Sequence, residues 1–522
     1  MSQQYLFNPL ANPMVNPLEE TTAAKITEPC IVVIFGATGD LTSRKLLPAL
    51  YNLKREGQLP AHFATVGFAR RPKTDQQFRQ EMCDAVSKFS RVKPIDTTLW
   101  NDFSEQIFYH ISEFDNDEGY IELRKRLEDI DTKFGTKGNR IFYLSTPPSY
   151  FSEIVEKLGT HELLYDPEKI QNKWSRVIIE KPFGTDLATA YELQKQITKH
   201  VKEEQIYRID HWLGKETVQN LLVMRFGNSI FESMWNNHYI DCVQITVSED
   251  LGVGTRGKFW EEAGMLRDIV QNHMMQLLSL VAMEPPVNTK ADSIRDEKVK
   301  VLQSLRPIPL SQIDHFAVRG QYGPGFIDNE AVKGYRQEDN VNPNSSVETY
   351  VALQLFVDNW RWAGVPFYLR AGKRLPKKAT EIAVCFKKAP GILFNKTSRS
   401  DDANVLVIRI QPDEGISLRI NSKVPGMSSQ VQPVKMDFRY GSYFGVQPPE
   451  AYERLICDCI LGDSTLFARE DEVFASWKHL TPILHHWQEI QPHDFPNYAA
   501  GSWGPTAADI LMHRHGRHWR YL

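Results

Sequence analysis

The stretch CIVVIFGATGDLTSRKLLPALYNLKREG, residues 30–57, indicates the fold class of this chain. Its first six residues form an apolar, β-branched run that predicts a buried strand. A turn with two glycines follows, and residues 40–57 have the pattern of an amphipathic helix. A strand that leads through such a turn directly into a helix is typical of α/β domains with a parallel sheet.

Alternation of strands and helices continues to about residue 208. Apolar runs at 61–70, 139–147 and 175–184 predict further strands, and helical segments follow the first and the last of them. Near-continuous apolar strands are typical of a parallel sheet that is covered on both faces. In such sheets, ligands bind beyond the carboxyl ends of the strands.

After residue 209 the pattern changes to β-rich segments joined by turns and loops. The predicted strands lie at 239–250, 348–357, 380–387, 404–410 and 416–420, and the predicted helices at 214–226 and 262–281. We therefore predict an α/β plus α+β protein with two domains. Residues 29–209 form a Rossmann-like dinucleotide-binding domain, and residues 210–522 form an α+β domain with a large, mainly antiparallel β-sheet.

The first 28 residues contain Asn-Pro pairs at 8–9, 12–13 and 16–17. Proline disfavours helix and pushes the preceding residue to extended conformations, so residues 1–28 are expected to form an irregular arm. The arm is either a loose tail, as termini usually are, or it docks a protein partner through Leu10, Met14 and Leu18.

Composition argues against several function classes. The 522 residues are 42% hydrophobic and 24% charged, with a net charge of −4 and six cysteines without regular spacing. A general nucleic-acid binder would be strongly basic, and a disulfide scaffold would be rich in cysteine. A membrane span needs roughly 20 consecutive apolar residues, which no segment has. We expect a cytoplasmic protein without nucleic-acid or membrane partners.

The glycine turn after the first strand is a candidate phosphate-binding loop. It comprises Gly36, Ala37, Thr38, Gly39, Asp40, Leu41, Thr42 and Ser43. Glycines let the backbone turn sharply and approach a pyrophosphate, whose charge faces the amide groups of the helix N-terminus. The pattern is Gly-x-x-Gly, not the full G-x-G-x-x-G, so an ordinary strand–helix turn is the alternative. The position after the first strand of an α/β array favours the nucleotide loop.

Arg70 bears on which nucleotide is bound. It follows the second strand, where NAD sites usually have an acidic residue that holds the ribose 2′-hydroxyl. A guanidinium instead binds a 2′-phosphate with charge-assisted hydrogen bonds. A solvated arginine at a strand end is the alternative. Together with the glycine loop, Arg70 favours NADP as the cofactor.

Two segments concentrate charged groups where the domains should meet. Lys181, in EKPFG, closes a strand at the ligand-binding edge of the sheet. In RIDHWLGK (208–215), a helix that includes residues 211–215 would place His211 and Lys215 on one face, where both could donate to a phosphate. The alternative is a solvated helix start that Asp210 caps.

The segment RDIVQNH (267–273) adds a carboxylate and an imidazole within the helix predicted at 262–281. Its apolar neighbours indicate burial, and a lone buried histidine is usually a core residue. Asp268 and His273 are five apart, which is about 140° around an α-helix, so they should not stack as a pair. A ligand that bridges this helix and another element would explain both.

Together with VPFYLRAGK (365–373), AYERLICDCILGD (451–463) and GSWGPTAAD (501–509), these motifs resemble the glucose-6-phosphate dehydrogenases in order and approximate spacing. The resemblance runs from about residue 29 to the C-terminus. It implies NADP-dependent oxidation of glucose 6-phosphate at C1, in the oxidative pentose phosphate pathway. It also implies that the C-terminal domain binds the substrate and assembles into a homodimer or homotetramer.

The resemblance assigns an expected role to each candidate residue. His273 is the general base for the C1 hydroxyl, which suits an imidazole with a pKa near neutrality, and Asp210 orients it and stabilises its charged form. Lys181 reaches substrate and cofactor at their junction. The other implied contacts are His211 and Lys215 to the sugar phosphate, Glu249 and Asp268 to the sugar, Lys373 and Lys378 to the substrate, and Gly36 to Ser43 with Arg70 to the nucleotide.

Two positions depart from the family pattern. Trp212 stands where tyrosine is frequent, which puts a hydrogen bond from this position in doubt. Trp503 stands where animal enzymes with a second, structural NADP have arginine, so a second NADP site is left open and is not predicted. The basic tail HRHGRHWR (513–520) lacks the spacing of metal ligands, and no metal is predicted.

Two other functions stay open. A second type of NADP sugar dehydrogenase, like glucose-fructose oxidoreductase, also has Glu-Lys-Pro after a strand, but an unphosphorylated sugar would give His211 and Lys215 no counter-charge. A silent NADP-binding sensor would not need His273 and Asp210. Redox control through Cys30, Cys457 and Cys459 is a further hypothesis, with buried, inert thiols as the simpler interpretation.

Overall fold

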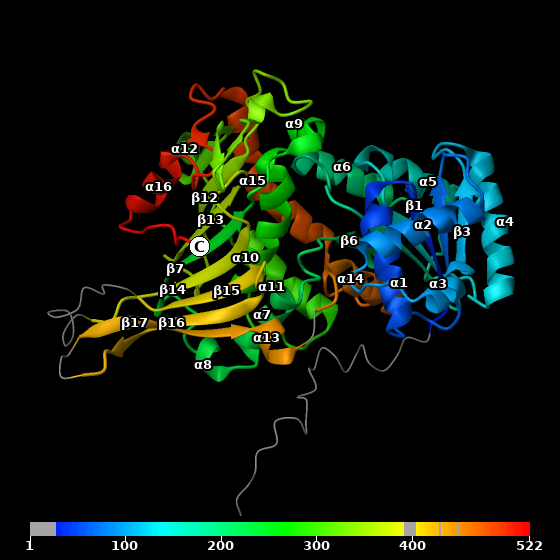
Figure 1. The fold of residues 1–522 in the computed structure, drawn as a ribbon, viewed down its shortest axis with the longest axis horizontal. Coiled ribbons are helices and arrows are strands. Elements are labelled where there is room, and N and C mark those ends of the chain that lie inside the picture. The colour runs from blue at the N-terminus through cyan, green and yellow to red at the C-terminus, as the bar shows by residue number, and fades with distance from the viewer. Residues whose placement is uncertain (1–27, 391–402, 427–429, 446–447) are drawn as a thin grey trace, which may run out of the picture.

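The computed structural model describes residues 28–390, 403–426, 430–445 and 448–522, which form two lobes that are each built around one large sheet (Figure 1). The arm predicted over residues 1–28 lies outside the described residues, apart from Glu28. Across the described part of the chain, every helix is too short or too polar to cross a membrane.

The N-terminal lobe contains a seven-stranded sheet. Across the sheet, the strands are β18 (Phe467–Ala468), β6 (Ile206–Ile209), β5 (Ser175–Ile179), β4 (Arg140–Leu144), β1 (Cys30–Phe35), β2 (Phe63–Ala69) and β3 (Ile107–Ile111). Six of them run parallel, and only β18 is antiparallel to its neighbour. The parallel α/β sheet predicted from residues 30–57 is therefore confirmed.

Strand β1 lies in the interior of the sheet, and all six of its side chains are apolar and buried, as an interior strand requires. Its two neighbours are β2 and β4, so the chain leaves β1 on one side and later returns on the other. Where the strand order reverses, the connecting loops separate and leave a crevice at the carboxyl edge of the sheet, which is where α/β proteins bind nucleotides.

Helices of the N-terminal lobe cover this sheet. They are α1 (Leu47–Arg55), α2 (Asp75–Phe89), α3 (Thr97–Ser104), α4 (Asp117–Phe134), α5 (Phe151–Thr160) and α6 (Leu187–Ile197). Local sequence sets several of their ends: Thr74 and Gln77 form a capping box on α2, and Gly135 ends α4 in the left-handed conformation.

The C-terminal lobe contains an eight-stranded sheet. Its order is β17 (Val431–Arg439), β16 (Gly415–Lys423), β15 (Val405–Gln411), β14 (Ala379–Phe386), β7 (Ile240–Ser248), β13 (Pro366–Gly372), β12 (Tyr350–Phe356) and β8 (Ala317–Gly320). Only β7 and β13 pair in parallel, and the other neighbours are antiparallel. The predicted α+β region with a mainly antiparallel sheet is confirmed.

Several helices of the C-terminal lobe lie between its sheet and the N-terminal lobe, whereas α12 (Ile313–Phe316) and α16 (Thr506–His513) lie on the far side (Figure 1). Figure 1 shows α10 (Met275–Ala282) and α11 (Ala291–Gln303) on the side of the sheet that faces the first lobe. Other helices of this region are α7 (Glu216–Phe226), α9 (Gly257–Met265) and α15 (Glu470–Glu489). Because α15 contacts both α6 and α11, it joins the two lobes.

The helix predicted at 262–281 is not one α-helix. It consists of the end of α9, a π-helix η5 (Leu266–Met274) and α10, with Gly264 at φ 65° marking a kink before the π-helix. The amide of Leu266 donates to the buried carboxylate of Glu348 at 3.1 Å. Glu348 lies just before β12, so a side chain from a distant segment supports the first residue of the π-helix. The α-helical prediction was wrong here because this contact is non-local.

Residues 451–468 return from the C-terminal half of the chain to the N-terminal lobe. Helix α14 (Ala451–Leu461) packs on α1, and β18 then pairs with β6. Cys457 and Cys459 lie on α14, where residues two apart face different directions, and Cys30 lies inside β1. Burial raises the pKa of the Cys30 and Cys457 thiols to about 12, which disfavours the reactive thiolate.

Candidate active site

The glycine loop has a backbone that only glycine permits at its first position. Gly36 has φ +79°, and a Cβ placed there would lie 2.2 Å from the carbonyl oxygen of Ser145. Gly39 donates its amide to the Gly36 carbonyl at 2.9 Å, and helical residues begin at Asp40. The loop therefore turns tightly at the carboxyl end of β1 and leads into a helix N-terminus, an arrangement that fits a pyrophosphate.

Parallel strand ends bring most of the candidate residues to this same edge of the sheet. Arg70 follows β2 and is exposed, Lys181 comes two residues after β5, and Asp210 and His211 follow β6 directly. Because β1, β2, β5 and β6 all end at one edge, the nucleotide loop and these charged groups face a common region.

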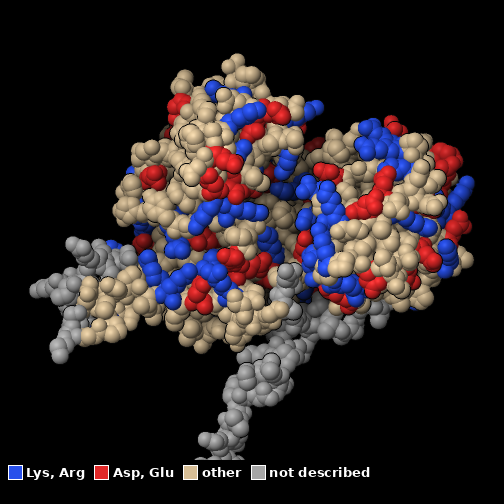
Figure 2. Space-filling view, in the orientation of Figure 1, with Lys and Arg blue, Asp and Glu red and all other residues tan. Residues whose placement is uncertain are grey.

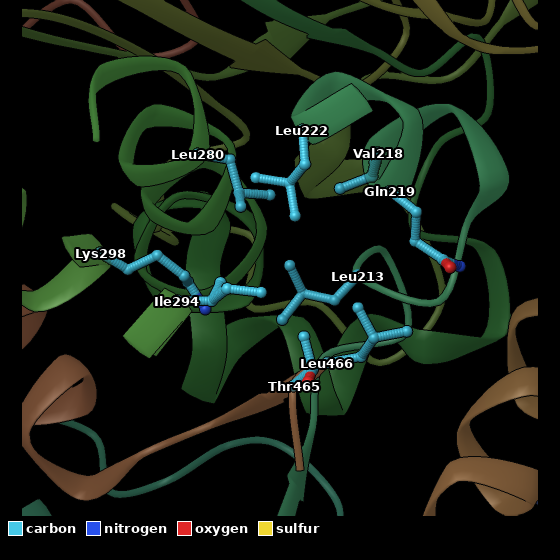
Figure 3. A pocket seen from close by; sticks show the side chains of 9 residues that line it. All are labelled: Leu213, Val218, Gln219, Leu222, Leu280, Ile294, Lys298, Thr465 and Leu466. Carbon is cyan, nitrogen blue, oxygen red and sulfur yellow. The ribbon is translucent and has the colours of Figure 1, made fainter. Parts of the chain in front are cut away.

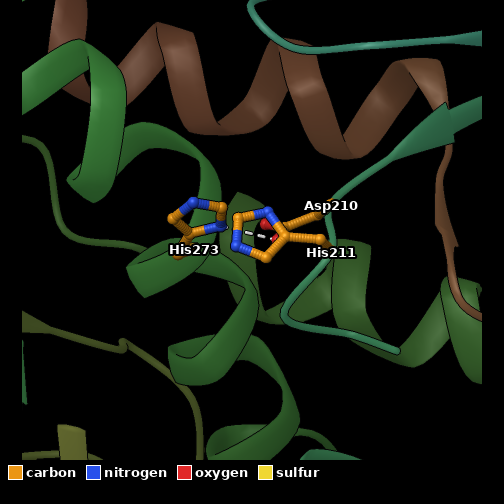
Figure 4. Close-up of side chains that lie close together, drawn as sticks. All are labelled: Asp210, His211 and His273. Carbon is orange, nitrogen blue, oxygen red and sulfur yellow. Dashed lines mark hydrogen bonds and ion pairs between the residues drawn. The ribbon is translucent and has the colours of Figure 1, made fainter. Parts of the chain in front are cut away.

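Asp210 and His273 form a buried pair. His273 Nδ1 and Asp210 Oδ1 are 2.6 Å apart, and the two residues are 1% and 4% exposed. Figure 4 shows the two groups converging from the loop after β6 and from η5. Burial alone would raise the pKa of Asp210, but the charges of His273 and His211 hold it below its usual value. Asp210 is thus a carboxylate that accepts from Nδ1–H, which leaves the lone pair of His273 on Nε2.

The π-helix also brings Asp268 and His273 to the same side. In a π-helix, whose hydrogen bonds join residues five apart, such residues lie roughly one turn apart and on nearly the same face. The expectation that Asp268 and His273 lie about 140° apart was therefore wrong. Lys181 Nζ donates to Asp268 Oδ1 and to the Asp268 carbonyl, both at 2.9 Å. Burial and the positive charge of Lys181 lower the pKa of His273, and the carboxylate of Asp210 acts against them.

His211 stands between His273 and a second aromatic group. Its ring centre lies 4.8 Å from that of His273 at 79°, and 6.1 Å from that of Tyr452 on α14 at 7°. Tyr143 and Tyr452 both donate a hydrogen bond to the carboxylate of the half-buried Glu180. Burial, His273 and the nearby lysines together hold the pKa of His211 well below its ordinary value.

Sequence analysis missed Tyr452 and Glu180 as supports of the site. Both residues lie inside motifs that it used, AYERLICDCILGD and EKPFG, and a glutamate before a Lys-Pro at a strand end was the available signal. Only the return of α14 to the N-terminal lobe brings them together, and that contact is not readable from local pattern.

The sequence suggested that one helix could contain both His211 and Lys215, but the structure shows no such helix. Residues 211–214 form turns, and Lys215 is the N-cap of α7. Its Nζ donates to Oε1 of Gln411, at the end of β15, at 2.5 Å. Burial lowers the pKa of Lys215 to about 8, with the charge of Lys378 contributing. His211 lies beside His273, and the charge of Lys215 acts on His211, so the two candidate residues stay near each other without sharing a helix.

A second group of candidates lies on one edge of the eight-stranded sheet. Glu249 follows β7, Lys373 follows β13, and Lys378 precedes β14, whose first residue pairs with the last residue of β7. Lys373 and Glu249 form an ion pair, and Lys373 Nζ lies 4.4 Å from the centre of the Trp260 ring. Strand β13 contacts η5, so this edge adjoins the helix that carries His273.

The charge around the site favours an anion. Figure 2 shows a hollow between the lobes, with Lys and Arg side chains along the border of the N-terminal lobe. The side chains of Asp210, His211 and His273 offer ligand atoms within 4.8 Å of one another. Three such groups, two imidazoles and a carboxylate, are of the kind that can bind a metal ion. The positive charges of Lys181 and Lys215 act on His211, however, and they would oppose a cation and attract a phosphate.

A small pocket behind the site has a different character. It is lined by Leu213, Val218, Gln219, Leu222, Leu280, Ile294, Lys298, Thr465 and Leu466, and leucines dominate its walls (Figure 3). Sugar phosphates need several converging polar groups, whereas this lining has only Gln219, Thr465 and Lys298, and Lys298 is already paired with Glu472. The pocket belongs to the packing between α7, α10 and α11.

Fold and site together define an oxidoreductase class: a nucleotide-type parallel sheet, with a buried histidine–aspartate pair and nearby lysines at the border with a second domain. Residues 33–220 match the family profile "Glucose-6-phosphate dehydrogenase, NAD binding domain", and residues 222–520 match "Glucose-6-phosphate dehydrogenase, C-terminal domain". The chain belongs to the glucose-6-phosphate dehydrogenase family.

Individual relatives agree over nearly the whole chain. Glucose-6-phosphate 1-dehydrogenase of Chlamydia muridarum is 57% identical over 94% of this chain and 97% of its own, and that of Bacillus subtilis is 46% identical over 94% and 98%. A solved glucose-6-phosphate dehydrogenase in complex with its substrate has a TM-score of 0.85 at 37% identity, covering 96% of this chain and 100% of that one. The enzyme from Mycobacterium avium has a TM-score of 0.81 at 34% identity, covering 95% and 99%.

Proposed function

We propose that this chain oxidises glucose 6-phosphate at C1 to 6-phospho-D-glucono-1,5-lactone with NADP as the oxidant, the first step of the oxidative pentose phosphate pathway. NADP, when bound, supplies the nicotinamide ring that accepts the hydride from C1. Family membership supports both the substrate and the cofactor. The observation that carries the proposal is the buried Asp210–His273 pair beside two lysines at the border of the lobes.

His273 acts as the general base. As the C1–H bond breaks, Nε2 takes the proton of the C1 hydroxyl and a C=O bond forms in the lactone. The Nδ1–H group continues to donate to Asp210, whose carboxylate fixes the ring and stabilises the imidazolium that results. Burial keeps the pKa of His273 low, so the base is neutral and ready at neutral pH.

His211 and Lys215 bind the 6-phosphate. Lys215 contributes a positive charge, and His211 contributes a ring N–H while it stays uncharged. A phosphate dianion in this position would raise the pKa of both groups and strengthen the contact. Lys378, whose charge acts on Lys215, joins the same binding region.

The sugar ring is held from two sides. Asp268 lies on η5 and is paired with Lys181, while Glu249 lies at the sheet edge and is paired with Lys373. Both carboxylates can accept hydrogen bonds from sugar hydroxyls. Lys181 extends from the nucleotide sheet to η5, so it stands where substrate and cofactor meet.

The nucleotide lies on the loop from Gly36 to Ser43, with Arg70 at the 2′-phosphate. Arg70 is exposed at the end of β2, next to β1. Its guanidinium can bind the 2′-phosphate of NADP, a group that NAD lacks. The contact is a proposal that rests on this placement and on the absence of a carboxylate at position 70.

We also propose a cytoplasmic homodimer or homotetramer. Family resemblance supports the assembly, and large apolar side chains are exposed on β17 and on the short helix α13 (Tyr440–Phe444), among them Met436, Tyr443 and Phe444. Light scattering coupled to gel filtration tests the assembly directly, and a monomer at micromolar concentration would contradict it.

Initial rates of absorbance increase at 340 nm test the function. The assay compares glucose 6-phosphate with glucose, and NADP with NAD. Fast NADPH formation that requires both the phosphate and NADP supports the proposal. Equal rates with free glucose would favour an unphosphorylated sugar as the substrate. NADP binding without turnover on glucose 6-phosphate would favour a silent sensor.

A further inference from the structure

Trp212, the residue that departs from the family pattern, lies flat against the proposed base. Its ring centre is 4.6 Å from that of His273, and the two planes differ by only 4°. Trp212 is 5% exposed, so the stack is protected from water. The imidazole and the indole therefore lie nearly parallel, in an offset stack.

The backbone of Trp212 is tied to the same carboxylate as the base. Its amide donates to Asp210 Oδ1 at 3.0 Å, and this is the oxygen that accepts from His273 Nδ1. Lys215, three residues on, donates its amide to the Trp212 carbonyl and holds its Nζ 5.5 Å from the Trp212 ring centre. One residue therefore contacts the base, its carboxylate partner and the phosphate lysine.

The stack discriminates between the two charge states of His273. The face of an indole is electron-rich, and tryptophan is the aromatic residue that attracts cations most strongly. Neutral imidazole gains only dispersion from the contact, whereas imidazolium gains electrostatic attraction as well. The contact thus opposes the burial and the Lys181 charge that lower the pKa of His273.

We propose that Trp212 is a positioning residue that holds the plane of His273 and stabilises the imidazolium formed when the base takes its proton. The part of this inference that concerns catalysis rests on the proposed function. A residue that merely filled the core would affect stability but would leave the proton affinity of His273 unchanged.

The first experiment is the pH profile of kcat, which reports groups in the substrate complex. Wild type is compared with Trp212→Phe and Trp212→Leu. Loss of the indole lowers the pKa of His273, and a base must be neutral to act, so the acid limb of Trp212→Leu moves to lower pH by about 0.5–1.5 units. Trp212→Phe, which keeps an aromatic face, moves by less. Superimposable acid limbs for wild type and Trp212→Leu would overturn the proposal.

A matched control separates this effect from loss of volume. Trp362→Leu removes another fully buried indole, one that donates to Ala282 O and packs on Phe367. We expect it to lower the melting temperature without moving the acid limb. An equal shift in Trp362→Leu would mean that core loosening, and not the stack, sets the profile.

The second experiment needs no turnover. Imidazolium quenches stacked indole fluorescence more than neutral imidazole does, so the fluorescence difference between wild type and Trp212→Phe should fall as pH is lowered through the pKa of His273. His273→Asn should abolish that titration. A pH-independent difference would refute the stack, whereas a titration in a protein that does not oxidise glucose 6-phosphate would uphold the stack and reject the proposed function.

Discussion

His273 Nδ1 and Asp210 Oδ1 lie 2.6 Å apart although 63 residues separate them in the chain. Asp210 follows the last parallel strand of the nucleotide sheet, and His273 lies on a π-helix of the other lobe. The pair is therefore assembled only when the two lobes meet, and both groups are almost fully buried there. This geometry brings the proposed base, the proposed phosphate-binding residues and the proposed nucleotide loop to one region.

Replacement of His273 by asparagine should lower kcat by roughly 10²–10⁴-fold, the amount expected from loss of a general base. Asparagine keeps similar bulk and a hydrogen bond to Asp210, so the KM for glucose 6-phosphate should change little. Steady-state kinetics at saturating NADP checks both values. An unchanged kcat would remove His273 from the mechanism.

Lys215 should impose an alkaline limb on kcat/KM for glucose 6-phosphate. Burial lowers its pKa to about 8, so the free enzyme loses this positive charge as pH rises through that value, and the phosphate then binds less tightly. Lys215→Arg keeps its charge over the whole range because the guanidinium does not titrate there. We expect the limb of Lys215→Arg to move up by more than about one unit. Identical limbs in the two proteins would show that another group titrates.

Arg70→Ala should raise the KM for NADP and leave the KM for NAD nearly unchanged. The lost hydrogen bonds to a charged phosphate correspond to roughly 1.5–3 kcal/mol, or about 10–150-fold in affinity. NAD serves as the internal control because it lacks the 2′-phosphate. An equal loss with both nucleotides would mean that Arg70 supports the loop and does not bind the phosphate.

Lys298 and Glu472 form an ion pair between α11 and α15, with side chains that are 1% and 0% exposed. Lys298→Met leaves the carboxylate buried without its counter-charge, and we expect a loss of about 3–5 kcal/mol in the free energy of unfolding. In the Lys298→Met/Glu472→Gln double variant no charge stays buried, and the amide oxygen can still accept from Gln276, but the bond from the Arg469 amide is lost, so part of the loss should be recovered. Urea denaturation measures both, and additive losses would contradict the pairing.

Local patterns predicted the elements that depend on local physics. The buried strand at 30–35 and its glycine turn were readable because apolar runs and glycine conformations are properties of the segment itself. The π-helix was not readable, because its start depends on a bond from Leu266 to Glu348, 82 residues away. The ring stack of Trp212 on His273 likewise depends on how the lobes meet.

The candidate residues came mainly from the family resemblance, and their spacing alone was misleading in two places. α-Helical spacing predicted that Asp268 and His273 point to different sides, and that a helix over residues 211–215 would hold His211 and Lys215 on one face. The structure reverses both expectations because a π-helix and a series of turns replace the predicted α-helix. Helical periodicity was a poor guide in both segments, since the chain departs there from regular α-helical geometry.

The most direct test is to supply glucose 6-phosphate labelled with deuterium at C1, together with NADP, and to measure the mass of the NADPH that forms. The account predicts that every NADPH molecule carries one deuterium, because the hydride comes from C1 while His273 takes only the hydroxyl proton. Unlabelled NADPH, or no NADPH from this substrate, would contradict it.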